Sequence, residues 1–237
     1  MQIGEANPAS TTGDQAMLPA SFRLGDTDLA VWPDNHAAAP ISASLMAIIT
    51  FADWAVYHPA LVEAALKAEK DPNLVVPLYR GLCGVKVRKI PEWSSPAAAL
   101  IHARALMLAH RTLSRKPVYS DDNWGSIYRA GDHCMPHSHL RSNVSIVYML
   151  DPGDGDPADP VAAKLCFSDP RIDACCPDEP GRVTRLMMPA MTPGTMLIFA
   201  SDYVHSVNPY YGKRPRITLS WNITLERLPG RPGEGWT

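Results

Sequence analysis

The sequence predicts an α+β protein with a mainly β core, in which an N-terminal helical layer packs on a C-terminal sandwich or barrel. Apolar residues recur at helical spacing, with cap signals, between residues 41 and 113. After Pro117 the pattern changes to short β-rich runs separated by turn signals. We therefore expect one folding unit over residues 41–237, made of a helical layer (41–116) and a β core (117–237).

Residues 1–40 are expected to form an N-terminal arm. They are rich in Ala, Pro, Ser, Thr, Asp and Gly and have no sustained hydrophobic period. The first twenty residues should be poorly ordered, because this composition buries too little apolar surface to offset the entropy of the chain. The apolar residues between Phe22 and Trp32 fit either one short strand or an arm that lies along the body.

The first part of the helical layer is predicted within residues 41–70. Leu45, Ile48 and Ile49 begin an apolar stripe that favours a helix. Pro59 fits a first-turn position of a following segment. This region is therefore expected to form two helices or one broken helix.

A longer helix is predicted from the cap Ser94-Ser95-Pro96 to about Leu113. It contains His102 and His110, whose separation of eight residues favours core or surface positions over metal binding. Between the two helical regions, residues 74–87 mix β-branched residues with Pro and Gly and indicate a strand and a turn.

The β core is predicted from short runs of strand-forming residues. Segments rich in Gly, Pro and Asp separate these runs, and many short strands at such a spacing are typical of a sandwich or barrel. The runs are 124–128, 144–150, 164–167, 183–188, 195–199, 204–207 and 217–225.

Composition and charge exclude several kinds of partner. The formal charge is −2 and cations alternate with anions, so the chain has no basic face for nucleic acid and no polybasic tract for a membrane surface. No apolar stretch approaches the ~20 residues of a membrane helix, and the N-terminus lacks a secretory signal pattern, so we expect a cytoplasmic protein. The five cysteines are sparse and odd in number, which favours free thiols. A small molecule is the expected partner, bound by a monomer or a homodimer.

A candidate metal site begins in residues 128–139, Tyr-Arg-Ala-Gly-Asp-His-Cys-Met-Pro-His-Ser-His. In an extended chain the side chains of His137 and His139 point the same way, so both can bind one ion. Imidazole is the commonest side-chain ligand for transition metals. His205 follows a Pro-Gly turn and an apolar run, and it is the best third ligand from a neighbouring strand. Three protein ligands leave coordination positions open, as metal catalysis requires.

Further motifs follow these histidines in a characteristic order. Together they resemble the iron(II)/2-oxoglutarate-dependent oxygenase superfamily over residues 124–225, and most closely the prolyl-hydroxylase-like branch and its uncharacterised bacterial oxygenases with an H-x-H motif. The motifs are Tyr128-x-x-Gly131-x-x-Cys134-x-Pro136-His137-x-His139, Val147-Tyr148-Met149-Leu150, Pro193-Gly194-x-Met196-Leu197-Ile198-Phe199, His205 and Arg216-Ile217-Thr218.

The resemblance implies a double-stranded β-helix, the jelly roll also found in cupins, with iron bound at one end. The implied ligands are His137, His139 and His205. The superfamily usually has Asp or Glu at the second position, so a histidine there keeps the full 2+ charge of iron until dianionic 2-oxoglutarate arrives. This change should strengthen co-substrate binding and weaken metal retention. Lower-ranked alternatives to His139, none of which stands two residues after His137, are Asp132, His133 and Asp202.

The resemblance also implies that Arg216 binds the distal carboxylate of 2-oxoglutarate. It stands 216 − 205 = 11 residues after His205, which is the separation found in the superfamily. A guanidinium group matches a carboxylate with two parallel hydrogen bonds, and Thr218, on the same strand face, can add a hydroxyl donor. Arg214 is the rival cation, and it is disfavoured because Pro215 makes Arg216 the better strand residue.

Other contacts with the co-substrate and the substrate are expected from aromatic residues. Cys134 stands where relatives often place a tyrosine that hydrogen-bonds the co-substrate. A thiol is a weak donor, so Tyr128 or Tyr148 is expected to serve instead, although either fits the core equally well. The substrate should lie between the barrel mouth, the helical layer and the loops 151–160 and 168–180. Weak candidates for substrate contacts are Trp124, Tyr148 and Trp221, of which both tryptophans fit the core better.

Three functions are consistent with these residues. The first is an Fe(II)/2-oxoglutarate-dependent oxygenase that oxidises, most simply by hydroxylation, a C–H bond of a small-molecule or amino-acid-like substrate. The second is a cupin-like dioxygenase with three histidine ligands that does not use 2-oxoglutarate, and it has no need of Arg216. The third is a non-catalytic module that binds a metal or a small molecule, suggested only by the missing carboxylate. No motif in the loops identifies the substrate.

Overall fold

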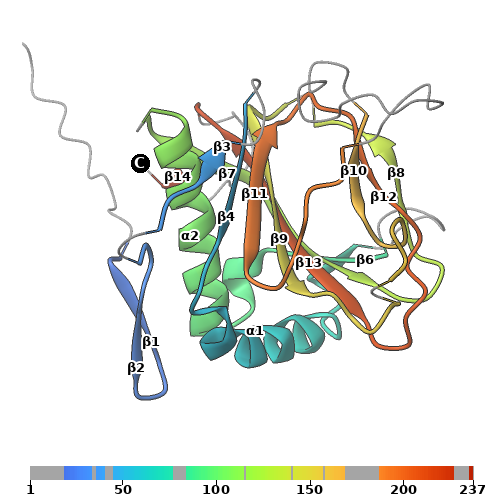
Figure 1. The fold of residues 1–237 in the computed structure, drawn as a ribbon. Coiled ribbons are helices and arrows are strands. Elements are labelled where there is room, and N and C mark those ends of the chain that lie inside the picture. The colour runs from blue at the N-terminus through green and yellow to red at the C-terminus, as the bar shows by residue number, and fades with distance from the viewer. Residues whose placement is uncertain are drawn as a thin grey trace, which may run out of the picture.

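The computed structural model describes residues 19–33, 36–40, 45–76, 84–114, 116–139, 141–156, 158–168, 187–226 and 235–236. Two antiparallel sheets face each other, and the helices cover the outer face of the larger one (Figure 1). The larger sheet has the strand order β3-β4-β11-β9-β13-β7-β6-β5, with β14 beside β7, and the smaller sheet has the order β10-β12-β8. A separate hairpin, β1-β2, lies at the N-terminal side.

The strands of the larger sheet are β3 (Ala39–Pro40), β4 (Met46–Thr50), β5 (Val75–Val76), β6 (Val85–Arg88), β7 (Val118–Tyr128), β9 (Val144–Asp151), β11 (Thr195–Ala200), β13 (Arg216–Thr224) and β14 (Gly235–Trp236). Those of the smaller sheet are β8 (Cys134–His137), β10 (Leu165–Phe167) and β12 (His205–Val207). The predicted runs of the β core correspond to these strands. The run 183–188 lies mostly outside the described residues, and its Met187 forms a bridge with Phe167.

Two helices and one turn of 3₁₀ helix form the helical layer. They are α1 (Trp54–Ala68), η1 (Ile90–Glu92) and α2 (Pro96–Thr112). The bounds of α2 agree with the prediction: Ser95 is its N-cap and Pro96 is its first residue. Proline suits that place because its missing N–H would have no helical partner there.

Strand β4 corrects the prediction of a helix that begins near Leu45. Ala47 and Ile49 pack in the core beneath the helices, while Met46 and Ile48 belong to a second cluster between the sheets. Because both faces of this strand are covered, its apolar residues do not alternate with polar ones, and so short a run has the same pattern as a buried helix. Residues 46–50 form a strand because they pair with β11 along their whole length.

Helix α1 is one continuous helix, in contrast to the predicted pair of helices or broken helix. Pro59 lies inside it rather than in its first turn. The apolar residues Tyr57, Leu61 and Ala65 are fully buried on its inner face. We infer that this burial offsets the backbone hydrogen bond that a proline inside a helix removes.

The hairpin of β1 (Ser21–Leu24) and β2 (Thr27–Ala30) packs on α2. Arg104 of α2 is completely buried and donates to the carbonyl oxygens of Ala30 at 2.7 Å and Val31 at 3.1 Å. The same guanidinium pairs with Asp53 at 2.6 Å, directly before α1. The arm therefore contributes a hairpin to the fold. The prediction of poor order concerned the first twenty residues, of which residues 1–18 lie outside the described part of the chain.

A single large hydrophobic cluster joins the helical layer to the β core. It includes Leu29 of the hairpin, Leu61 of α1, Leu106 of α2 and Leu219 of β13. In β13 every residue is buried, because the helices cover one face of the strand and the smaller sheet covers the other. Alternate residues thus face a pocket between the sheets, namely Arg216, Thr218, Ser220 and Asn222. Among the described residues no helix is long and apolar enough to cross a membrane.

Candidate metal centre

The smaller sheet brings two of the predicted ligands together. His137 is the last residue of β8 and His205 is the first residue of β12, and the two are direct partners in the antiparallel pair. His139 follows β8 in a loop, where its backbone N–H donates to the carbonyl oxygen of Ser201 at 2.8 Å. Cross-strand pairing and this loop contact therefore place three side chains at one point, although 66 residues of chain separate His139 from His205 (205 − 139 = 66).

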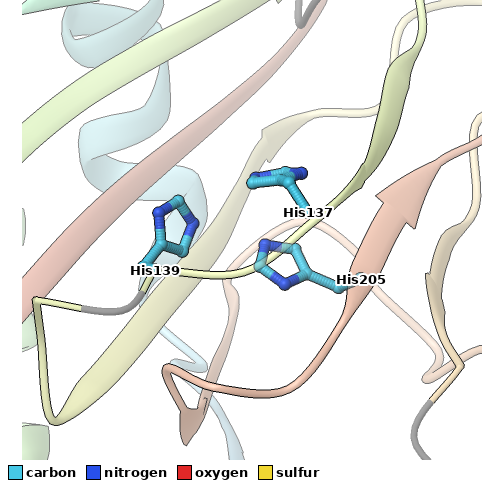
Figure 2. A group of neighbouring side chains, drawn as sticks. All are labelled: His137, His139 and His205. Atoms are coloured by element: carbon cyan, nitrogen blue, oxygen red, sulfur yellow. The ribbon is translucent and has the colours of Figure 1, made fainter.

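The three imidazole rings have a geometry that suits one metal ion. One nitrogen from each ring lies within 4.8 Å of the others, and the rings turn toward a common point (Figure 2). Nitrogens bound to one ion at ~2.1 Å are at most ~4.2 Å apart, so small rotations of the rings suffice to enclose an ion. In the described part of the chain no other group of three such side chains occurs. The lower-ranked alternatives, Asp132, His133 and Asp202, are not part of this cluster.

Backbone carbonyl groups select the metal-binding nitrogen in two of the three rings. The Nδ1–H of His137 donates to the carbonyl oxygen of Met135 at 2.8 Å, and that of His205 donates to Tyr203 at 2.9 Å. A carbonyl oxygen can only accept a hydrogen bond, so each Nδ1 must carry the proton. Each Nε2 then has a lone pair that is available to a metal ion.

Burial keeps His139 and His205 uncharged near neutral pH. The pKa of His205 is lowered to about 3 and that of His139 to about 4, mainly by burial and also by the neighbouring His137. Only neutral imidazole can bind a metal. The site is thus poised for a cation without first having to lose protons from these two rings.

Arg216 lies in the same pocket as the histidines. Its side chain is 2% exposed, and its guanidinium group lies 5.2 Å from the ring of Tyr128. Among the described residues, its Nη1 is the one buried side-chain nitrogen or oxygen atom without a hydrogen-bond partner. Burial without an anionic partner lowers the pKa of Arg216. A buried, incompletely paired cation in a pocket is the complement of a carboxylate ligand.

Arg214, the rival cation, lies outside the pocket. Its side chain is 62% exposed and pairs with Asp151 at 3.3 Å. By contrast Thr218, two residues after Arg216 on the same face of β13, is buried and lines the pocket. Tyr128 also lines it and is the cross-strand partner of Arg216.

Cys134 is buried in the pocket wall, with its Sγ atom 3.6 Å from His137 Nδ1. It is disulfide-bonded, so the expectation of a free thiol is wrong for this residue. A disulfide sulfur has no S–H group to donate, which removes Cys134 as a hydrogen-bond donor to a co-substrate. Cys166 is a free, buried cysteine as predicted.

Residues 122–222 match the model of a family described as "Putative 2OG-Fe(II) oxygenase". The matched stretch contains all three clustered histidines as well as Arg216 and Thr218. This part of the chain is therefore similar to the 2OG-Fe(II) oxygenases. The match supports the prediction, made from the sequence motifs, of a dioxygenase that uses Fe(II) and 2-oxoglutarate. No curated protein matches the sequence closely enough to count as a relative.

Several solved structures have the same fold. EctD from S. alaskensis, with 2-oxoglutarate and 5-hydroxyectoine, has a TM-score of 0.54 and 18% identity over 81% of this chain and 78% of its own. The epimerase SnoN, in complex with Fe3+, alpha ketoglutarate and nogalamycin RO, has a TM-score of 0.54 and 17% identity over 82% and 91%. A Pseudomonas putida prolyl-4-hydroxylase has a TM-score of 0.52 and 16% identity over 76% and 93%. These similarities confirm the predicted double-stranded β-helix.

The predicted aromatic contact residues divide between the two faces of the larger sheet. Trp124 lines the pocket, with its ring centroid 6.0 Å from that of His139 and the Nζ atom of Lys86 3.7 Å above it. Tyr148 belongs to the core under the helices, where its hydroxyl group lies 2.7 Å from that of Tyr57. The indole of Trp221 lies in the same core and donates to His102 Nδ1 at 3.0 Å. Tyr148 and Trp221 are therefore positioned as core residues.

Sequence reasoning missed three polar residues next to His139. They are Ser145, Ser201 and Asn222, which are buried and hydrogen-bonded to one another. A signal for Asn222 was present in β13, whose sequence Arg-Ile-Thr-Leu-Ser-Trp-Asn-Ile-Thr alternates polar and apolar residues. In an enclosed strand, that alternation indicates a polar pocket on one side.

The buried His102 is expected to make the folded protein less stable as the pH falls. Burial lowers the pKa of His102 to about 4 in the folded state, and the indole N–H of Trp221 requires an unprotonated Nδ1. The unfolded chain takes up a proton near pH 6.5, so the stabilising contribution is complete above that pH and is lost as the pH falls toward 4. The loss between pH 7.5 and pH 4.5 should be roughly 2–3 kcal/mol.

Urea unfolding of wild type and His102→Asn at these two pH values checks this expectation. The asparagine keeps an acceptor for Trp221 but does not titrate. The fall in unfolding free energy should be roughly 2–3 kcal/mol smaller in the variant, because the other buried histidines contribute equally to both proteins. Equal falls in the two proteins would show that His102 is not the titrating group.

Proposed function

We propose that this protein is an Fe(II)/2-oxoglutarate-dependent oxygenase that hydroxylates a C–H bond of a small-molecule or amino-acid-like substrate, with conversion of 2-oxoglutarate and O2 to succinate and CO2. The observation that carries the proposal is one pocket that contains three clustered histidines and a buried arginine whose Nη1 has no hydrogen-bond partner among the described residues. Iron(II), when bound, activates dioxygen for the oxidation of a C–H bond at the expense of 2-oxoglutarate. The protein supplies positioning, charge and exclusion of water.

The metal is proposed to bind to His137, His139 and His205. His137 and His205 offer Nε2, because the Nδ1–H of each donates to a backbone carbonyl oxygen. The Nδ1 of His139 lies 3.3 Å from the side-chain amide of Asn222, and its Nε2 is proposed to be the third ligand. A neutral set of ligands leaves the charge of the cation uncompensated. The dianionic co-substrate compensates it, so binding of the metal and binding of 2-oxoglutarate should reinforce each other.

The co-substrate is proposed to bind with its distal carboxylate on Arg216. The unpaired Nη1 of Arg216 can then donate to a carboxylate oxygen, and the hydroxyl group of Thr218 on the same face can add a second donor. Tyr128 packs beside the guanidinium group and restricts its rotation. Apolar side chains of the pocket, including Met149, Leu165 and Val207, limit access of water.

The substrate is proposed to enter on the side of Trp124. Arg216 and Asn222 are six residues apart on β13, which corresponds to roughly 20 Å along the pocket. Trp124 lies at the end away from Arg216, beside His139, where a substrate can reach the metal without displacing the co-substrate. The small molecules named with the EctD and SnoN structures, 5-hydroxyectoine and nogalamycin RO, support a small-molecule substrate.

Anaerobic addition of Fe(II) and then 2-oxoglutarate tests the proposal. A weak visible charge-transfer band should appear only when both are present, and exposure to air should then produce succinate, even without the primary substrate. Iron binding with neither a band nor succinate would contradict the proposal and favour a three-histidine dioxygenase that does not use 2-oxoglutarate. A panel of amino-acid-like and other small molecules is then tested. The members that accelerate succinate formation identify the substrate class.

A further inference from the structure

A chain of buried polar side chains leads from His139 into the end of the larger sheet. Asn222 Nδ2 lies 3.3 Å from His139 Nδ1, and Asn222 Oδ1 lies 3.0 Å from Ser145 Oγ. Ser145 Oγ in turn lies 2.9 Å from Ser201 Oγ. The three residues are 8%, 2% and 1% exposed, in the order Asn222, Ser145, Ser201. Buried polar groups need hydrogen-bond partners, and here each side chain is hydrogen-bonded to the next one in the chain of groups.

The backbone places this chain of groups with little freedom. Ser145 and Asn222 are cross-strand partners on β9 and β13. Ser201 directly follows β11, and its carbonyl oxygen accepts the backbone N–H of His139 at 2.8 Å. The larger sheet thus holds both the backbone and the ring of His139, whereas His137 and His205 belong to the smaller sheet.

The ring of His139 differs from the other two in the partner of its Nδ1 atom. His137 and His205 face carbonyl oxygens, which can only accept, so their protons must lie on Nδ1. The partner of His139 is an amide, which can donate or accept. With Asn222 Nδ2 toward the ring, the amide donates, the proton of His139 lies on Nε2, and no lone pair remains there for a metal.

Turning the amide end for end reverses this assignment. Oδ1 then accepts from the Nδ1–H of His139, which leaves a lone pair on Nε2. Asn222 Nδ2 donates to Ser145 Oγ, and Ser145 can donate to Ser201, so no group in the chain loses its partner. The hydroxyl pair is therefore compatible with the amide orientation that a bound metal requires.

We propose that Asn222 is a positioning residue for the metal: its amide oxygen holds His139 in the Nδ1–H tautomer with Nε2 toward the ion, and Ser145 and Ser201 hold the amide. The proposal rests on His139 being a ligand, as argued under the proposed function. A carboxylate in place of His139 could bind the metal without selection of a tautomer. An imidazole needs that selection, and partners of this kind typically change metal affinity 10–100-fold.

Anaerobic titration of the metal-free protein with Co(II) tests the proposal through affinity and the visible absorption of bound cobalt. Asn222→Ala should lower Co(II) affinity roughly 10–100-fold. Asn222→Asp should bind at least as tightly as wild type, because a carboxylate can accept from both His139 and Ser145. Asn143→Ala is the matched control, since Asn143 Oδ1 accepts the N–H of Leu225 at 2.9 Å, whereas the side chain that is hydrogen-bonded to His139 is that of Asn222. Its affinity should equal that of wild type.

The proposal is overturned if Asn222→Ala binds Co(II) within twofold of wild type, or if Asn222→Asp is no tighter than Asn222→Ala. Urea unfolding of the metal-free variants verifies that they are folded. Should Asn222→Ala fail to fold, Asn222→Leu keeps the branched shape of the side chain, removes the amide and carries the same expectation. Wild-type protein that does not bind Co(II) would contradict the proposed function itself, so the two failures are distinguishable.

Discussion

Replacing His139 by alanine is expected to lower Fe(II) affinity by more than ~100-fold, since loss of an outer partner of a ligand already costs about 10–100-fold. His139→Asp should instead bind Fe(II) more tightly than wild type, by about tenfold or more, because a carboxylate adds an attractive charge at ligand distance. The same charge should weaken 2-oxoglutarate binding, since the site becomes less positive. Anaerobic equilibrium titration with Fe(II), followed by titration with 2-oxoglutarate, measures both changes.

His133→Ala is the matched control for the variants of His139. His133 belongs to the same histidine-rich stretch, but its Nδ1 lies 3.2 Å from the carbonyl oxygen of Gly131 and it is not part of the cluster. Its iron affinity should be unchanged. Stoichiometric iron in His139→Ala would show that another residue completes the ligand set. Succinate formation by His139→Asp would show that this position corresponds to the usual carboxylate of the superfamily.

Replacing Arg216 by methionine is expected to weaken 2-oxoglutarate binding by about 2–4 kcal/mol, or roughly 30- to 900-fold, the usual cost of removing one partner of a buried charge pair. The metal affinity of the protein without 2-oxoglutarate should change little. The metal-free variant should be as stable as wild type or more stable, because Arg216 is buried and its Nη1 has no partner among the described residues. Titration of the charge-transfer band with 2-oxoglutarate and urea unfolding measure these two effects.

Arg214→Met is the control for this prediction. Arg214 is two residues away, exposed, and paired with Asp151 outside the pocket. Its loss should leave 2-oxoglutarate affinity within about twofold, because exposed ion pairs contribute little. A larger loss of 2-oxoglutarate affinity in Arg214→Met than in Arg216→Met would show that Arg214, and not Arg216, binds the carboxylate. A fall in both stability and affinity in Arg216→Met would indicate a structural role.

The opposite effects expected at Arg216 follow from its place in the fold. Thr218 and Ser220, its neighbours on the pocket face of β13, are also polar and buried. Burial of these polar groups lowers the free energy of unfolding relative to an apolar lining, and a bound ligand that forms hydrogen bonds with them raises it again. Binding of 2-oxoglutarate is therefore expected to stabilise the folded wild-type protein.

Much of the site was predictable from local sequence because its groups are defined by spacing. The i and i+2 histidines, the isolated His205 and the arginine eleven residues after it are visible without a structure, and the family match and the clustered rings agree with them. The caps of α2 and most strands of the β core were likewise predicted, since Ser-Pro and Pro-Gly signals act on adjacent residues. The roles of the individual site residues remain predictions until the variants are measured.

The sequence by itself determined the fold class, the chemical type of the site and the residues expected to bind iron and 2-oxoglutarate. Only the tertiary structure decided that residues 46–50 are a strand, that Tyr148 and Trp221 face the helices, and that Asn222 contacts His139. The physical reason is the same in each case. These outcomes depend on which strand pairs with which and on what covers each face of the larger sheet, and both involve residues far apart in the chain.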